Sequence, residues 1–99
     1  MARLPSLSAL RAFEAAGRLG SFAKAAAELF VTQAAVSHQV RALEEQLGYP
    51  LFQRTTRRLA LTDEGRRFLP AAQRLLDDMR HAVAELDVGE TGTGVGLGD

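Results

Sequence analysis

The feature that most constrains this chain is the run from Ser21 to Arg54, S-F-A-K-A-A-A-E-L-F-V-T-Q-A-A-V-S-H-Q-V-R-A-L-E-E-Q-L-G-Y-P-L-F-Q-R. Its apolar periodicity predicts two short helices joined by a tight turn at Phe30-Val31, followed by the first strand of a hairpin. Ser21 and Thr32 are good N-caps for the two helices, and Gly48 is a common helix stop. The run therefore predicts a helix-turn-helix that leads directly into a strand.

The second of these helices has two chemically different faces. At about 100° per residue, one side is apolar and must face the core; it consists of Val36, Val40, Leu43 and Leu47. In a helix-turn-helix the second helix enters the major groove of DNA, led by its N-terminal residues. We therefore expect base reading by the outward residues near the start of the helix, Gln33, Ala34, Ser37 and His38. The alternative is an exposed polar surface without a ligand.

Elements on either side complete a winged helix-turn-helix. Apolar residues at every third position predict a helix from about Ser6 to Ala16, with Gly17 and Gly20 bracketing a break. Residues 51–54 and 59–61 read as two short strands, joined by a basic connection without Gly, Asn or Pro, which makes a tight turn improbable. We expect contacts to DNA phosphates from Thr32, Arg41, Arg54, Thr55, Thr56, Arg57 and Arg58. The alternatives are a solubilising loop and, for Arg41, an ion pair with Glu45.

A long helix is predicted from Asp63 to about Asp87, after Thr62. Its apolar residues are spaced alternately three and four apart, which is a heptad pattern; they are Leu69, Ala72, Leu76, Met79, Val83 and Leu86. A small chain cannot cover so long a helix along its whole length, so we expect this seam to form a dimer. A purely intramolecular core is the alternative. Pro70 lies within the helix and predicts a kink.

Composition excludes several other chemistries. The chain has no cysteine and only two histidines, His38 and His81, so we expect no disulfide, no metal site and no cofactor. Ser37 and His38 point about 100° apart on one helix, with no acid to orient the histidine, so we expect no enzyme. No apolar run approaches the roughly 20 residues of a membrane span, and no secretory signal is present. A cytoplasmic protein without membrane contact is the expectation.

Charge is distributed unevenly along the chain. Residues 1–60 carry eight basic and four acidic side chains, a net +4, whereas residues 61–99 carry four basic and eight acidic ones. The basic half is where a polyanion would dock. We divide the chain into a winged helix-turn-helix domain at 1–62, a linker and dimerisation helix at 63–88, and a flexible glycine-rich tail at 89–99. The fold class is mostly α.

The order of these motifs resembles the LysR-type transcriptional regulators. The matching segments are L-x-A-L-R-A-F-E-A-A near the start, the run described above, and then P-L-F-Q-R and L-T-D-E-G. The segment V-T-Q-A-A-V-S-H-Q resembles the corresponding segment of the subgroup that contains the glycine-cleavage activator and the β-lactamase regulators. The resemblance covers residues 4 to about 87. It implies a winged helix-turn-helix, a linker helix that dimerises, and an interrupted palindrome with a T-and-A core as the promoter site.

By motif position, the resemblance implies that four residues contact DNA bases, Gln33, Ala34, Ser37 and His38. It also implies that Arg54 is the arginine of the wing. Many relatives carry Pro or Ser where this chain has Ala34, and Arg where it has His38, which leaves the preferred DNA sequence open. In these relatives the effector-binding site lies in a separate domain beyond the linker helix. We therefore expect no small-molecule effector site in the 99 residues. The expected function is a homodimeric, sequence-specific DNA-binding transcription regulator, with higher oligomers in a full-length form. The alternative is a dimerisation module that pairs with full-length relatives and modulates them.

Overall fold

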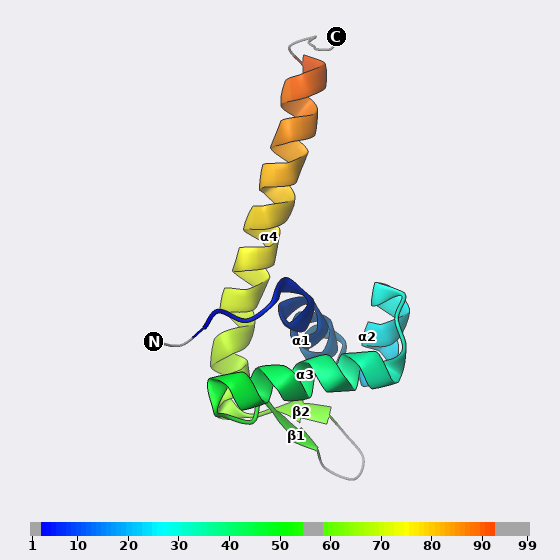
Figure 1. Ribbon diagram of the computed structural model, residues 1–99, viewed down its shortest axis with the longest axis vertical. Coiled ribbons are helices and arrows are strands. Elements are labelled where there is room, and N and C mark those ends of the chain that lie inside the picture. Colours follow the sequence, from blue (N-terminus) through cyan, green and yellow to red (C-terminus); the bar gives the residue numbers. More distant parts are fainter. Residues whose placement is uncertain (1–2, 55–58, 93–99) are drawn as a thin grey trace.

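A computed structural model of the chain describes residues 3–54 and 59–92, with side chains as far as Leu86. Its elements are α1 (Leu7–Leu19), α2 (Phe22–Leu29), α3 (Gln33–Leu47), β1 (Phe52–Arg54), β2 (Leu59–Leu61) and α4 (Asp63–Gly92). The strands pair antiparallel with Phe52 opposite Leu61, and they form a two-stranded wing. Figure 1 shows α1, α2, α3 and the wing gathered around the lower part of α4, whose upper part projects away. The predicted winged helix-turn-helix with a long final helix is confirmed.

Side-chain oxygens fix where the helices begin. The hydroxyls of Ser6, Ser21 and Thr32 accept hydrogen bonds from the backbone N–H three residues on, at 3.0–3.1 Å. Thr62 does the same for Gly65 at 3.0 Å. These bonds satisfy N–H groups that a helix leaves without an internal partner. The helix starts after Ser21, Thr32 and Thr62 were therefore predicted correctly.

Two predicted helix ends were wrong. α1 continues through Gly17 to Leu19, and the chain breaks at Gly20 alone, which has the left-handed φ of 66°. Gly17 lies within the helix, and its missing side chain leaves room for Leu69 of α4, whose Cδ1 would lie 3.3 Å from a Cβ there. α4 runs to Gly92, past the predicted end near Asp87 and into the segment expected to be a tail. The connection Thr55–Arg58 and the rest of that segment lie outside the described residues.

The core is organised around Phe13 of α1, which is fully buried. Its ring centroid lies 5.6 Å from that of Phe52 on β1 and 5.5 Å from that of Phe68 on α4. Phe22 of α2 meets Phe52 edge-on at 5.7 Å. Tilted and edge-on contacts of this kind are favoured between aromatic rings. One aromatic cluster therefore joins α1, α2, the wing and the start of α4, and it fixes the wing and the helix-turn-helix in one body.

Candidate nucleic-acid interface

The outward face of α3 carries the residues expected to read DNA. Val36, Val40 and Leu43 are fully buried beneath it, as the periodicity predicted, and hold the helix on α1. On the opposite side Gln33, Ala34, His38 and Arg41 are exposed and Ser37 is half-buried. Thr32, also exposed, caps the helix just before them. The polar set is therefore presented to solvent by a helix whose other face is locked in the core.

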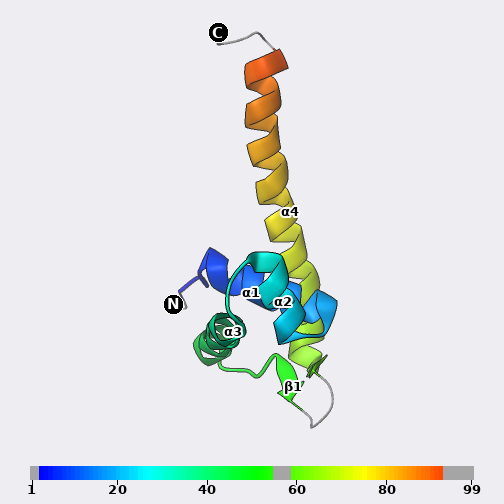
Figure 2. The ribbon, with the colours of Figure 1, turned by 90° about the vertical axis from the view of Figure 1, so that its right-hand side faces the viewer.

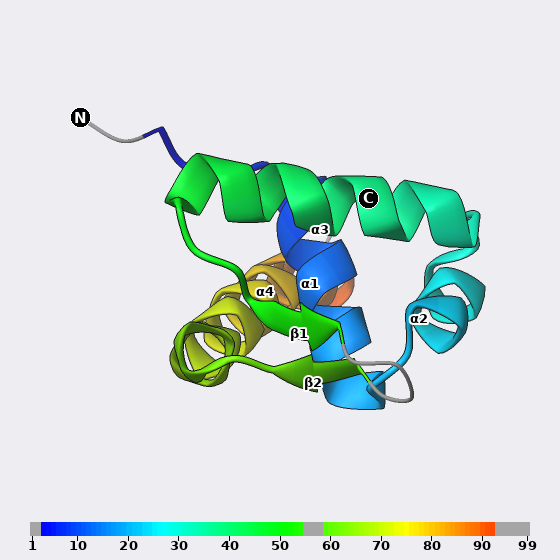
Figure 3. The same cartoon turned by 90° about the horizontal axis from the view of Figure 1, so that it is seen from below.

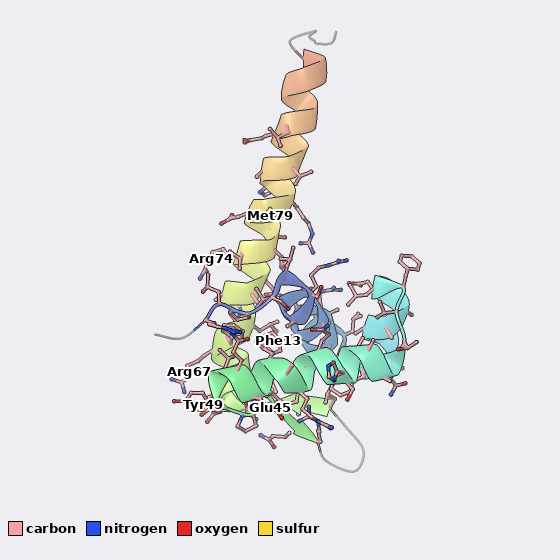
Figure 4. All side chains as sticks on the ribbon, viewed as in Figure 1. Phe13, Glu45, Tyr49, Arg67, Arg74 and Met79 are labelled. Atoms are coloured by element: carbon pink, nitrogen blue, oxygen red, sulfur yellow. The ribbon has the colours of Figure 1, made fainter. Side chains whose placement is uncertain are left out.

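The wing lies beside α3 at the same end of the molecule. Figure 3, seen from below, shows α3 and both strands together on that side, and Figure 2 shows α4 leaving in the opposite direction. In Figure 4, Glu45 and Tyr49 mark the C-terminal part of α3 and its continuation, next to Arg67 at the foot of α4. A ligand that contacts α3 at this end would therefore also meet the wing, but not the projecting part of α4.

Glu44 attaches the wing to α3. One of its carboxylate oxygens accepts hydrogen bonds from the backbone N–H of Leu51 at 2.8 Å and of Phe52 at 3.2 Å. The other accepts from the guanidinium of Arg54 at 3.1 Å. The Glu44 side chain is only 11% exposed, so these donors replace the water it has lost. This anchor was not predicted from the sequence; its one signal there is an acid next to the apolar seam of the helix, eight residues before the first residue of β1.

Arg54 is therefore engaged within the protein. Besides Glu44, its guanidinium lies 5.8 Å from the centroid of the Phe22 ring. The side chain is 36% exposed, so part of it still faces solvent. The structure does not form the alternative ion pair between Arg41 and Glu45, and Arg41 is exposed. The remaining predicted phosphate contacts, Thr55, Thr56, Arg57 and Arg58, lie outside the described residues.

The predicted seam of α4 divides into two halves. Leu69, Ala72 and Leu76 pack within the protomer itself, with Ala72 and Leu76 buried. Met79, Val83 and Leu86 are exposed, as is Leu75 beside them. Figure 4 places Met79 where α4 has already passed the level of α1. The first half of the seam is thus covered by the protomer's own helices, and only the second half is open to a partner.

Comparison with known proteins identifies the family. The pattern described as "Bacterial regulatory helix-turn-helix protein, lysR family" matches residues 7–66. The chain belongs to the LysR family. Members of this family are transcription regulators, so this LysR-family chain is a DNA-binding regulator domain and not an enzyme. The matched region contains α1, α2, α3, the wing and the first turn of α4.

Similar proteins and structures agree with this assignment. The chain is 56% identical over 87 residues to the HTH-type transcriptional activator AmpR of Providencia stuartii, and 50% identical over 84 residues to the glycine cleavage system transcriptional activator of Escherichia coli K12. It covers 30% and 28% of the length of these two relatives. The crystal structure of the BenM_DBD/benA site 1 DNA complex superposes with a TM-score of 0.77 at 36% identity. That match spans 83% of this chain and 92% of the other.

A structure of OxyR from Corynebacterium glutamicum superposes with a TM-score of 0.84 at 30% identity, over 90% of this LysR-family chain and 28% of the other. Two negative findings apply to the described residues. None of the helices there is long and apolar enough to cross a membrane. The same part of the chain contains no group of three or more His, Cys, Asp or Glu side chains placed to hold a metal ion.

Proposed function

We propose that this LysR-family domain is a homodimeric, sequence-specific reader of a palindromic promoter site on double-stranded DNA in the cytoplasm. The observation that supports this most directly is the outward polar face of α3, which is held rigidly by a buried apolar face. The similarity to BenM_DBD, which was solved in a DNA complex, supports double-stranded DNA as the ligand. The reading helix would enter the major groove with its N-terminal residues leading.

Each residue assigned to base reading on α3 has a role that follows from its chemistry. The amide of Gln33 can pair with the N6 and N7 edge of adenine, and the Ser37 hydroxyl can bond to several base edges. His38 can donate to guanine or to a phosphate, and the Ala34 methyl can contact the methyl group of thymine. Phosphate contacts are assigned to Thr32, Arg41 and the wing residues Arg54, Thr55, Thr56, Arg57 and Arg58.

Dimer formation is assigned to the projecting half of α4. At about 1.5 Å per residue, this 30-residue helix is about 45 Å long, and α1 covers only its first half. The exposed residues Leu75, Met79, Val83 and Leu86 lie along one side of the helix. Burying each of these side chains against a second copy would stabilise the dimer by roughly 1.5–3 kcal/mol. One domain reads half a palindrome, so the dimer supplies the second half.

The same exposed half of α4 also supports a second function. A chain that pairs with full-length relatives through this surface would modulate them without reading DNA itself. Binding of the purified homodimer to a palindrome separates the two functions. A homodimer that has no measurable preference for any DNA sequence, yet exchanges into dimers of a longer relative, would favour this second function.

Selection of bound sites from random DNA is the primary test. We expect an enriched palindrome with half-sites one helical turn or a multiple apart. Gln33→Ala should then cost about 1–3 kcal/mol at particular base pairs and little at others. Gln46→Ala, at the exposed far end of the same helix, is the matched control. Equal losses on specific and random DNA would exclude base reading by Gln33.

A further inference from the structure

Four polar side chains join α1, α2 and α4, and we call them the three-helix hub: Glu14, Arg18, Glu28 and Gln73. Arg18 donates from Nε and from a terminal nitrogen to the two carboxylate oxygens of Glu14, at 2.8 and 3.2 Å. It also donates to Glu28 of α2, in one bond at 3.1 Å. Gln73 of α4 donates to Glu14 across 3.4 Å. The hub therefore links the linker helix to both α1 and the first helix of the helix-turn-helix.

Glu14 is the centre of the hub. It is 7% exposed and is the one buried charged residue among those described. A buried carboxylate is costly unless it is paired and hydrogen-bonded, so its partners are held to a particular geometry. Because Arg18 lies between two carboxylates, its own pKa is raised, and its hydrogen bonds lower the pKa of Glu28. Asp77 and Arg80 of α4, which pair with each other at 2.7 Å, line the same hollow.

The hub adds direction to an otherwise apolar contact. α4 is attached to the domain core mainly through the apolar side chains of Phe68, Leu69 and Ala72, and hydrophobic contact is not directional. Hydrogen bonds to a carboxylate do restrict angle as well as distance. Within the described residues, the bond from Gln73 to Glu14 is the one side chain–side chain hydrogen bond between α4 and the helices α1–α3.

The direction of α4 has a large effect at its far end. From Leu76 to Gly92 the helix continues for about 24 Å at 1.5 Å per residue. A tilt of about 10° at Leu76 would move that end by about 4 Å over this length. This exceeds the rise of about 3.4 Å between successive phosphates on one DNA strand. A small change in the angle between α4 and the helix-turn-helix would therefore change where a second reading helix falls on DNA.

We propose that the hub sets the angle at which α4 leaves the winged helix-turn-helix, and thereby the spacing of half-sites that the dimer accepts. The proposal rests on the proposed dimeric DNA reading. Glu14 and Gln73 are then positioning residues for spacing specificity, because neither lies on the outward face of α3. Arg18 and Glu28 extend the same control to α2.

The test uses two readouts on the 99-residue chain. The first is the affinity for synthetic palindromes whose central gap is varied by one base pair at a time. The second is a distance distribution between spin labels at Lys24→Cys on α2 and His81→Cys on α4, both exposed positions in a chain without cysteine. Labelled protein is mixed with an excess of unlabelled protein, so that each dimer carries one labelled chain. The variants are Gln73→Met and Glu14→Gln.

We expect Gln73→Met to broaden the distance distribution and to reduce the affinity ratio between the best gap and its neighbours several-fold. Affinity for the best gap should change much less. Asp63→Asn, which breaks an exposed ion pair within α4, is the control and should change neither readout. If Gln73→Met and a folded Glu14→Gln both keep the wild-type distribution and the wild-type ratio, the proposal is wrong. A wild type that binds every gap equally contradicts the proposed function, whereas the label distances report on the hub without DNA.

Discussion

Arg54 pairs with the protein's own Glu44, and we propose a DNA phosphate as its second partner. It lies 3.1 Å from the Glu44 carboxylate but remains partly exposed. If it also neutralises one phosphate, Arg54→Ala should weaken binding to all DNA sequences alike and reduce the salt dependence of log K by about 0.9. Binding measured at several salt concentrations gives this slope.

Glu44→Gln is the companion variant for Arg54. The amide keeps an oxygen for the backbone donors Leu51 and Phe52 but removes the negative charge that holds Arg54. The salt slope should therefore not fall in this variant. If Arg54→Ala lowers affinity and leaves the slope at the wild-type value, Arg54 acts only by holding the wing.

The ion pair of Glu28 with Arg18 predicts that the folded domain loses stability as the pH falls. Its hydrogen bonds from Arg18 lower its pKa below the ordinary value of 4.5. The stabilisation is therefore complete above pH 4.5 and is lost as the pH falls through the lower folded-state value. We expect the melting temperature of the wild type to fall more steeply below pH 4.5 than that of Glu28→Gln. Glu45→Gln, an exposed acid on α3, should keep the wild-type slope; an equally steep fall in Glu28→Gln would contradict the assignment.

At the scale of elements, the start of α4 depends on a close approach between Gly65 and the wing. A Cβ at Gly65 would lie 2.1 Å from the backbone oxygen of Leu51, which also accepts a hydrogen bond from the Thr62 N–H at 3.0 Å. The first turn of α4 and the approach to β1 are thus in direct backbone contact. Only glycine allows this contact without a shift of one element.

Gly65→Ala should therefore destabilise the fold by about 1–3 kcal/mol, although alanine is the better helix former. Gly17→Ala is the matched control, because a Cβ there meets side-chain carbons of Leu69 and Leu61, which can adjust, and no backbone atom among its nearest neighbours. Chemical denaturation of both variants gives the comparison. A Gly65→Ala protein as stable as Gly17→Ala would show that the close approach is not required.

At the scale of the whole molecule, the two halves of α4 have different surroundings. Its first half lies in the domain core, where Leu76 is 4% exposed, and its second half projects beyond the domain with Met79 and Val83 each about half exposed. The heptad pattern runs through both halves without a break. A substitution intended to test dimerisation must therefore be made in the second half.

Met79→Asp with Val83→Asp should yield a folded monomer that no longer binds a palindrome tightly. Two carboxylates in the seam oppose burial against a partner but leave the protomer core intact. Sedimentation measures the mass, and circular dichroism confirms the helices. Leu76→Asp is the contrasting variant and should unfold the domain. A dimer that persists in the double variant would place the interface elsewhere.

Local sequence patterns were sufficient to predict which helices and strands form and which face of α3 is exposed. Caps at Ser21 and Thr32, the stop at Gly48 and the apolar spacing of α3 act within a few residues, so the sequence shows them directly. The exposure of Gln33 and His38 follows from the same periodicity. The end of α1 was predicted too early because Gly17 was interpreted as a break in the helix, whereas it lies inside α1 against Leu69 of α4, a contact that the sequence does not show.

By itself, then, the sequence determined the winged helix-turn-helix, the outward polar face of α3 and the presence of a long helix after the wing. Tertiary structure decided which polar groups meet: Glu44 with Arg54, ten residues apart, and Glu14 with Gln73, 59 apart. It also decided which half of the α4 seam is covered. Periodicity and caps depend on near neighbours along the chain, whereas pairing and coverage depend on where packing places segments that the sequence holds far apart.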